Sequence, residues 1–251
     1  MSPPAKLEIC VDSLKGLEAA VEGGADRIEL CSSLALGGLT PTPSLIVAAV
    51  QCDIPVRVMI RPHQGHFVFD AGDIALMKCD IDMVHQMGLE GVVLGANLAD
   101  GQLDIKTLSE LISASEGLKL TLHRSFDLTP EPFIALEQAI ELGFDTILTS
   151  GCAKSALEGQ DLIAQLQQKA AGRIDIMAGS GVTAHNIAQL QKTTQTPWFH
   201  GSASQVISHL SPDIGFAVCE LGFWTQGMKQ TDLSAVKALK AALYSSVETC
   251  E

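Results

Sequence analysis

Polar and sulfur-bearing side chains recur in the first short apolar segments of the chain. Glu8 and Cys10 alternate with apolar residues in one segment, and Glu29 and Cys31 do so in the next. Residues two apart share one face of a β-strand, so each segment presents a carboxylate and a thiol together. On neighbouring strands, we expect Glu8 beside Glu29 and Cys10 beside Cys31. Two buried carboxylates need a counter-charge to stay ionised, and Arg61, at the end of a third segment, could bridge them or bind an anionic ligand.

The sulfur atoms form a candidate site for a soft metal ion. Cys10 and Cys31 would lie on adjacent strands, and Met59 shares the inward face of the third segment. Thiolates and thioethers select Cu(I). Buried cysteines also simply fill the layers of a core, so the residues alone leave both interpretations open. Arg57, on the same face as Met59, is expected at a solvated strand start.

A fifth apolar segment ends in a histidine, an arginine and an aspartate within five residues. These are His123, Arg124 and Asp127. His123 could serve as a general base or as a metal ligand. Asp127 could orient His123 or pair with Arg124. The alternative interpretation of the cluster is a structural ion pair.

Glycines and serines follow the last three apolar segments. Backbone N–H groups in such turns, aided by the dipole of a following helix, bind phosphate and other anions, and we expect Thr183 to cap one of those helices. The candidate anion-binding residues are Ser150, Gly151, Gly179, Ser180, Gly181, Gly201 and Ser202. The candidate catalytic residues are Glu8, Glu29, Arg61, His123, Arg124 and Asp127. Together they would suit an isomerase-like or lyase-like enzyme acting on a small phosphorylated or carboxylated metabolite, with His123 or Glu29 moving a proton.

Eight short apolar segments alternate with amphipathic ones along the chain. Strands are predicted over 7–11, 27–31, 55–61, 91–95, 118–123, 146–150, 174–178 and 198–200. Helices are predicted over 13–22, 42–51, 72–87, 105–115, 131–142, 155–171, 184–192 and 233–247. This alternation indicates parallel strands, and eight units favour a closed (β/α)₈ TIM barrel over a doubly wound open sheet. The prediction is an α/β protein with one domain over residues 1–251 and its site at the carboxyl ends of the strands.

The stretch 201–231 between the last strand and the last helix is predicted to be a long irregular loop. Its large apolar residues, Trp224 among them, would make it a lid or a contact in a homo-oligomer.

Composition narrows the classes of partner. The formal net charge of −13 repels nucleic acid and anionic membrane surfaces. No signal peptide is expected, and no apolar run is long enough to span a bilayer. The seven cysteines are widely spaced without a zinc pattern. They indicate reduced thiols and a cytoplasmic protein.

Several longer motifs resemble those of the CutC family. They are Leu7-Glu8-Ile9-Cys10, residues 24–31, residues 37–41, Ile60-Arg61-Pro62, residues 123–127, residues 148–151 and residues 177–182. The resemblance extends from about residue 7 to residue 202. It implies a (β/α)₈ barrel, a cytoplasmic location and a role in copper homeostasis, with Cu(I) bound through Cys10 and Cys31. It implies no particular reaction, so the enzyme interpretation stands beside it. A non-catalytic scaffold is disfavoured because an inward ring of charges costs stability.

Overall fold

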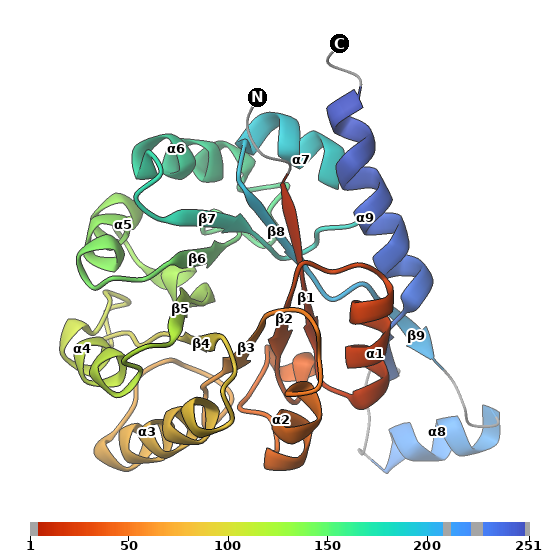
Figure 1. Ribbon diagram of the computed structural model, residues 1–251, viewed down its shortest axis with the longest axis horizontal. Coiled ribbons are helices and arrows are strands. Elements are labelled where there is room, and N and C mark those ends of the chain that lie inside the picture. Colours follow the sequence, from red (N-terminus) through yellow and green to blue (C-terminus); the bar gives the residue numbers. More distant parts are fainter. Residues whose placement is uncertain (1–4, 208–211, 222–227, 249–251) are drawn as a thin grey trace.

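The computed structural model describes residues 5–207, 212–221 and 228–248. Eight parallel strands form a closed barrel in the order β1-β2-β3-β4-β5-β6-β7-β8, and helices surround it (Figure 1). The strands are β1 (Lys6–Val11), β2 (Arg27–Leu30), β3 (Val56–Met59), β4 (Gly91–Leu94), β5 (Lys119–Leu122), β6 (Thr146–Thr149), β7 (Asp175–Ala178) and β8 (Trp198–Gly201). The predicted TIM barrel is confirmed.

The helices follow the strands nearly as predicted. They are α1 (Leu14–Glu22), α2 (Pro43–Ala49), α3 (Ala71–Gln86), α4 (Ile105–Ala114), α5 (Pro132–Glu141), α6 (Gln160–Ala170), α7 (Ile187–Thr194) and α9 (Leu233–Glu248), with short 3₁₀ turns η1 (Leu34–Leu36) and η2 (Arg124–Leu128). Ser13 caps α1 by accepting from the Gly16 N–H, which satisfies one of the free donors at the helix start. Among the described helices, none combines the length and apolar character that crossing a bilayer requires.

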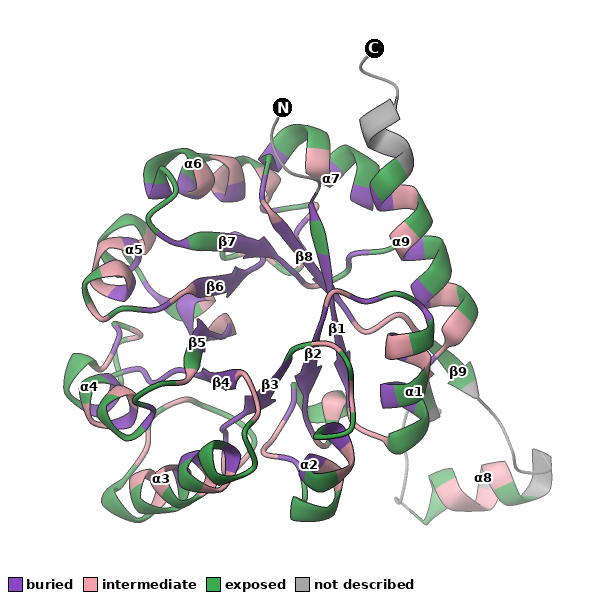
Figure 2. Cartoon of the chain, viewed as in Figure 1, coloured by how far each residue is buried: buried purple, intermediate pink, exposed green. Residues whose placement is uncertain are grey.

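The apolar core lies between the barrel and its helices. Leu7, Ile9 and Val11 of β1 are fully buried and belong to one cluster with residues of the surrounding helices. The helices packed around the barrel, α1 to α7 and α9, turn buried residues towards the strands and exposed residues outward (Figure 2). Because side chains alternate along a strand, this apolar outer face forces Glu8 and Cys10 into the barrel interior.

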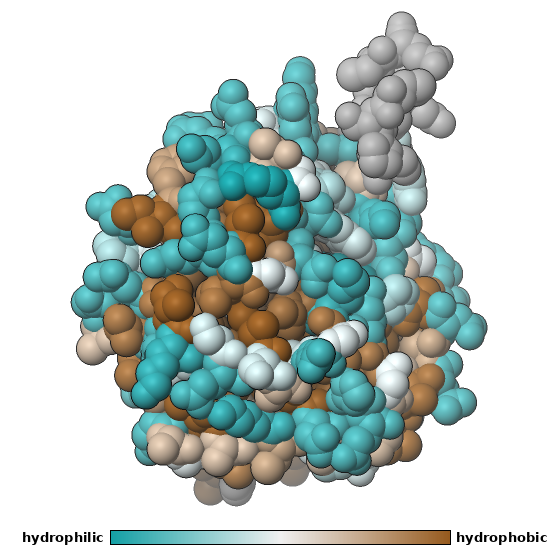
Figure 3. All heavy atoms as spheres, turned by 60° about the vertical axis from the view of Figure 1, so that its left-hand side comes forward, coloured by the Kyte–Doolittle hydropathy of each residue, from teal (hydrophilic) through white to brown (hydrophobic). Residues whose placement is uncertain are grey.

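The side of the barrel that carries α3 to α6 shows apolar side chains among hydrophilic ones (Figure 3). Leu76 of α3, Leu128 of η2 and Ile134 of α5 are all more than half exposed. Singly exposed apolar residues are common on folded domains. This face therefore identifies no binding site by itself.

The predicted pairing between the first two strands is wrong by two residues. The register places Cys10 opposite Glu29 and Glu8 opposite Arg27. Strands in a closed barrel are tilted and staggered, so residues at equal distances from their strand starts do not face one another.

The prediction of a long irregular loop over 201–231 is also wrong. This stretch contains β9 (Ser204–Ile207), α8 (Pro212–Glu220) and β10 (Met228–Thr231). The strands β9 and β10 pair antiparallel, with Ser204 opposite Thr231, and β10 lies beside α1. A short strand whose partner follows after a helix leaves no local periodicity strong enough to reveal the pair. The predicted contact through Trp224 falls outside the described residues.

Candidate functional site at the barrel mouth

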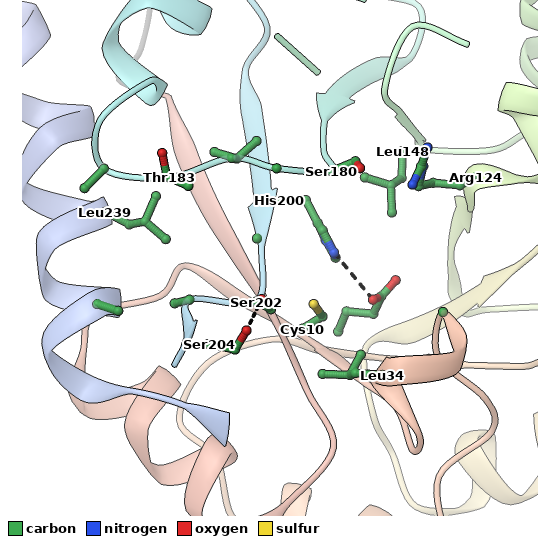
Figure 4. Close-up of a pocket in the computed structure, with 18 of the residues that line it drawn as sticks. Cys10, Leu34, Arg124, Leu148, Ser180, Thr183, His200, Ser202, Ser204 and Leu239 are labelled. Carbon is green, nitrogen blue, oxygen red and sulfur yellow. Dashed lines mark hydrogen bonds and ion pairs between the residues drawn. The ribbon is translucent and has the colours of Figure 1, made fainter. Parts of the chain in front are cut away.

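The carboxyl ends of the strands surround a cavity of about 680 Å³. Figure 4 shows His200 pointing into it above Cys10, with Ser180, Ser202 and Arg124 around it. The predicted site residues that line the cavity are Cys10, Glu29, Met59, Arg61, His123, Arg124, Ser180, Gly181, Gly201 and Ser202. Glu8, Cys31, Asp127, Ser150, Gly151 and Gly179 are not among the lining residues.

Glu8 is the centre of a buried charge cluster beneath the cavity. Its side chain is completely buried. One carboxylate oxygen accepts from Arg27 Nε, and the other lies 2.8 Å from His200 Nδ1. Burial raises the pKa of Glu8, but the charge of Arg27 and the bonds from His200 and Arg27 outweigh it and lower that pKa from 4.5 to about 2. Glu8 is therefore ionised at neutral pH.

Arg61 does not bridge Glu8 and Glu29, which was one of the two roles considered for it from the sequence. Its guanidinium group donates to the carbonyl oxygens of Leu36, Gly38 and Gly65 at 3.1, 3.1 and 2.9 Å. The counter-charge for Glu8 is Arg27, because the strand stagger brings Arg27 rather than Glu29 opposite it. Arg61 instead holds the loop that follows β2 over the barrel mouth.

The prediction that Arg57 lies at a solvated strand start is also wrong. It is only 4% exposed. Its Nε lies 3.0 Å from a Glu90 oxygen, and its NH1 donates to Thr121 Oγ1 at 2.7 Å. The inward face of β3 places this side chain in the lower barrel interior, where Glu90 and Thr121 satisfy it.

Cys10, Glu29 and His200 converge at the floor of the cavity. One ligand atom from each lies within 4.8 Å of the others, and all three residues are buried. Glu29 Oε2 is 3.7 Å from His200 Nε2 and accepts from Cys31 Sγ at 3.5 Å. The other oxygen of Glu29, Oε1, is buried and has no partner among the described residues. An orphaned carboxylate oxygen beside a thiol and an imidazole is a donor set that can hold a metal ion.

The protonation states at this floor depend on burial and on mutual charge. Burial raises the pKa of the Cys10 thiol. Burial and the charge of Glu29 raise the pKa of the Cys31 thiol well above its usual value. Burial alone would lower the pKa of His200, but the negative charges of Cys10 and Glu29 raise it well above 6.5. These shifts depend on one another, because Cys10 and Glu29 raise the pKa of His200 only while they carry negative charge, and the charge of His200 in turn lowers the pKa of Cys10.

Cys31 and Met59 lie together in the wall of the barrel. They form a small apolar cluster with Val93. A Cβ atom on Gly38 would lie 3.2 Å from Cys31 Sγ and 3.4 Å from Met59 Cε, and Gly38 has a φ of +84°. Glycine at this position therefore lets the loop close tightly over the two sulfur atoms.

Two functional candidates, Arg27 and His200, were missed from the sequence. His200 precedes Gly201 and Ser202, and only those two residues were considered there, as anion-binding candidates. Arg27 begins a strand without any distinguishing pattern. The pairing of β1 with β8 sets Glu8 opposite His200. Only the inward-facing position of His200 on the last strand could have indicated its role, because barrel closure joins residues at opposite ends of the chain.

His123 caps the 3₁₀ turn η2. Its Nδ1 accepts the backbone N–H of Ser125 at 3.1 Å. Burial, followed by the positive charge of Arg61, lowers the pKa of His123 from 6.5 to about 3. Asp127 does not orient His123. It pairs instead with Arg124 at 2.7 Å, which is the second of the two arrangements considered from the sequence.

The predicted anion-binding residues divide into two groups. Ser180, Gly181, Gly201 and Ser202 reach the cavity, whereas Ser150 Oγ is bonded to Asp127 at 3.0 Å and to the Ala153 carbonyl at 2.6 Å. A Cβ atom on Gly151 would lie 2.3 Å from the Gly159 carbonyl oxygen, and one on Gly179 would lie 2.4 Å from Leu148 Cδ1. These two glycines permit close packing instead of facing the cavity. Thr183 does not cap a helix, because α7 begins later, after Asn186.

The low pKa of His123 predicts an acid-sensitive fold. In the unfolded chain this histidine takes up a proton near pH 6.5, whereas in the folded protein it does so only near pH 3. Stability present above pH 6.5 is therefore lost as the pH falls towards 3. Between pH 7.5 and 5.5, the free energy of unfolding should fall by about 1.4 kcal/mol more in the unmodified protein than in His123→Gln. Urea denaturation at both pH values measures this difference, and parallel losses in the two proteins would contradict it.

Comparison with known proteins places these features in context. The CutC family matches residues 5–205. A protein of Caulobacter vibrioides named CutC is 48% identical over 94% of this chain and 97% of its own length. One of Sinorhizobium medicae with the same name is 47% identical over 94% and 95%. The crystal structure of the Streptococcus agalactiae CutC protein, to which copper homeostasis is assigned provisionally, has a TM-score of 0.76 and 32% identity over 79% of this chain and 98% of that chain. Thiamine phosphate pyrophosphorylase from Pyrococcus furiosus, at 13% identity and a TM-score of 0.60 over 97% of each chain, shares the fold alone.

Proposed function

This chain belongs to the CutC family, and on that premise we propose that it binds Cu(I) in the mouth of its barrel and takes part in copper homeostasis in the cytoplasm. The observation that carries the proposal is the buried Cys10 thiol at the cavity floor, which lies within 4.8 Å of the ligand atoms of Glu29 and His200, while Cys31 donates to the same Glu29 carboxylate. The copper role assigned to the Streptococcus agalactiae relative supports it.

The chemistry of the donors fits Cu(I) better than a harder ion. Cu(I) prefers thiolate and thioether ligands, so Cys10 is the principal ligand. Cys31, 3.5 Å from the Glu29 carboxylate, and Met59 beside it supply further sulfur atoms. His200 acts as a neighbouring positive charge that favours the Cys10 thiolate.

Charge balance also supports a bound monovalent ion. Two thiolates and Glu8 carry three negative charges, and Cu(I), Arg27 and His200 carry three positive ones. Burial raises the pKa of Glu29, which disfavours a fourth negative charge in the metal-bound site. A buried site without net charge avoids the large desolvation cost of an isolated ion.

The state of the cysteines supports a reducing compartment. Cys10, Cys31, Cys52, Cys79, Cys152 and Cys219 are all free thiols in the described part of the chain. Free thiols persist where glutathione and thioredoxin keep them reduced. Such a compartment also maintains copper as Cu(I).

A competition titration under reducing, anaerobic conditions tests the proposal. Loss of partners outside the coordination sphere already costs about 10–100-fold in metal affinity. Replacing both ligands in Cys10→Ser/Cys31→Ser should therefore lower Cu(I) affinity by at least about 100-fold. The matched control is Cys79→Ser/Cys152→Ser, since both of these thiols are exposed. Equal affinity in the site variant and the control would end the copper proposal.

A second candidate function is an enzyme acting on a small phosphorylated or carboxylated metabolite. The specific observation in its favour is the cavity of about 680 Å³, which far exceeds the needs of one ion and lies in the usual range for small-molecule sites. Ser180 and Gly181 from the loop after β7 line it, as do Gly201 and Ser202 at the end of β8. Ser180 has a φ of +74°, an uncommon conformation for a residue other than glycine that often marks functional loops.

A further inference from the structure

We propose that His123 is a fixed hydrogen-bond donor whose Nε2–H binds the carbonyl or carboxylate oxygen of a small ligand in the cavity. This role deepens the second candidate function, on which it rests, by naming the chemical class of the ligand. It differs from the general-base role considered from the sequence.

The hydrogen bond at Nδ1 determines which nitrogen carries the proton. Ser125 offers a backbone N–H, which can only donate, and it lies 3.1 Å from His123 Nδ1. Nδ1 is therefore the unprotonated nitrogen. A neutral imidazole has one protonated nitrogen, so the proton resides on Nε2. The lone pair that a general base would use is already occupied by Ser125.

The environment keeps the ring neutral and holds it in place. Burial and the nearby Arg61 charge lower the pKa of His123 to about 3. The Phe67 ring packs against it with centroids 4.7 Å apart. A Cβ atom on Gly95 would lie 2.6 Å from His123 Cε1 and 2.7 Å from Nδ1. Any side chain at position 95 would therefore collide with the imidazole, and glycine at this position leaves room for the ring.

The Nε2 atom is the feature that points to a ligand. It is buried and has no hydrogen-bond partner among the described residues, although His123 lines the cavity. Buried polar groups almost always have partners, so an orphaned donor at a cavity wall marks a place for an acceptor. Glu29 Oε1, in the same cavity, is likewise without a partner in the described chain.

The character of this wall identifies the acceptor. An uncharged N–H beside the Phe67 ring suits a carbonyl or carboxylate oxygen whose attached carbon atoms can pack against that ring. A neutral donor of this kind also stabilises negative charge that develops on a carbonyl oxygen without giving up its proton. The ligand class is therefore a small compound with a ketone, aldehyde or carboxylate group.

The tautomer is testable without any ligand or metal. In protein labelled with ¹⁵N-histidine, two-bond ¹H–¹⁵N correlations distinguish the two neutral tautomers and the imidazolium form. We expect His123 to show a protonated Nε2 and an unprotonated Nδ1 throughout pH 5–9, a range that stays above its pKa of about 3. An Nδ1–H pattern, or conversion to imidazolium within that range, would overturn the assignment. Because no copper is present, this result is independent of the copper titration.

Ligand binding is tested with three probes, followed through the Nε2 signal. Pyruvate carries both oxygen types, acetate carries only the carboxylate, and dihydroxyacetone carries only the ketone. We expect a saturable shift of the Nε2 signal with pyruvate and with at least one of the single-group probes, which identifies the bound oxygen. A signal unmoved by all three probes would overturn the proposal.

Two variants of His123 distinguish the effect of its hydrogen-bond donor from the effect of its packing. His123→Gln keeps an N–H donor near the position of Nε2, whereas His123→Leu keeps bulk without a donor. Because one hydrogen bond typically changes an equilibrium by roughly fivefold, His123→Leu should bind the effective probe about fivefold more weakly than His123→Gln. Ligand-detected NMR measures both affinities, and amide spectra confirm that each variant is folded. Equal affinities would show that the donor is not used.

Discussion

Replacing Arg27 with methionine should lower the free energy of unfolding by about 3–5 kcal/mol, because it leaves a buried charge without its partner. Arg27 is 3% exposed and Glu8 is completely buried. In Arg27→Met, His200 Nδ1 at 2.8 Å is the remaining basic partner of Glu8. The guanidinium group also stacks over the Trp198 ring at 3.9 Å, so packing is lost as well. Urea denaturation at pH 7 measures the change.

Two further variants separate the charge effect from a general loss of packing. Glu8→Gln in the Arg27→Met background removes the orphaned carboxylate and should recover part of the lost stability. Arg173→Met breaks another arginine–glutamate ion pair, with Glu137, but both of those side chains are substantially exposed. Exposed pairs contribute little, so this variant should unfold almost like the unmodified protein. Equal losses in Arg27→Met and Arg173→Met would refute the buried-charge explanation.

The affinity for Cu(I) should rise steeply with pH, by about 100-fold per pH unit between pH 6 and 8. Burial raises the pKa of both Cys10 and Cys31 from the usual value of 9.0. Both thiols are therefore protonated throughout this range, and each must release a proton to bind the metal as thiolate. The pKa of His200 is raised well above 6.5, and we expect this residue to carry the same charge with and without the metal, so that it adds no further proton to the slope.

The pH dependence of the Cu(I) affinity reports how many thiols bind the metal as thiolates. In Cys31→Ser one proton fewer is released, so the dependence should fall to about tenfold per pH unit. Cys152→Ser, which removes an exposed thiol, should keep the full slope. The measurement is a competition titration at several pH values, corrected for protonation of the competing chelator. An unchanged slope in Cys31→Ser would exclude that thiol from the coordination sphere.

Features that depend on a single strand or helix turn were predicted correctly from the local sequence. The alternation of Glu8 and Cys10 with Leu7 and Ile9 correctly placed the polar pair inside the barrel. The start of the first helix was correctly predicted at Ser13, which caps that helix. These features depend on φ and ψ preferences and on the period of two along a strand, which neighbouring residues express by themselves.

The composition of the site was harder to predict, because it depends on register. Arg61 was considered as a counter-charge for Glu8, but the stagger of the strands supplies Arg27 instead. For the same reason Cys10 lies opposite Glu29 rather than Cys31. A shift of two residues keeps every side chain on its predicted face while changing its neighbours, so a hydrophobic pattern cannot detect it.

By itself, the amino-acid sequence determined the eight β/α units, the inward direction of the acidic and thiol side chains, and membership of the CutC family. Only the tertiary structure decided that His200 joins Glu8 and Cys10, that Arg57 is buried, and that residues 204–207 and 228–231 pair. The physical reason is the same in each case. Strand direction and face are encoded by residues close together in the chain, whereas barrel closure and strand stagger are set by hydrogen bonds and packing between residues far apart in it.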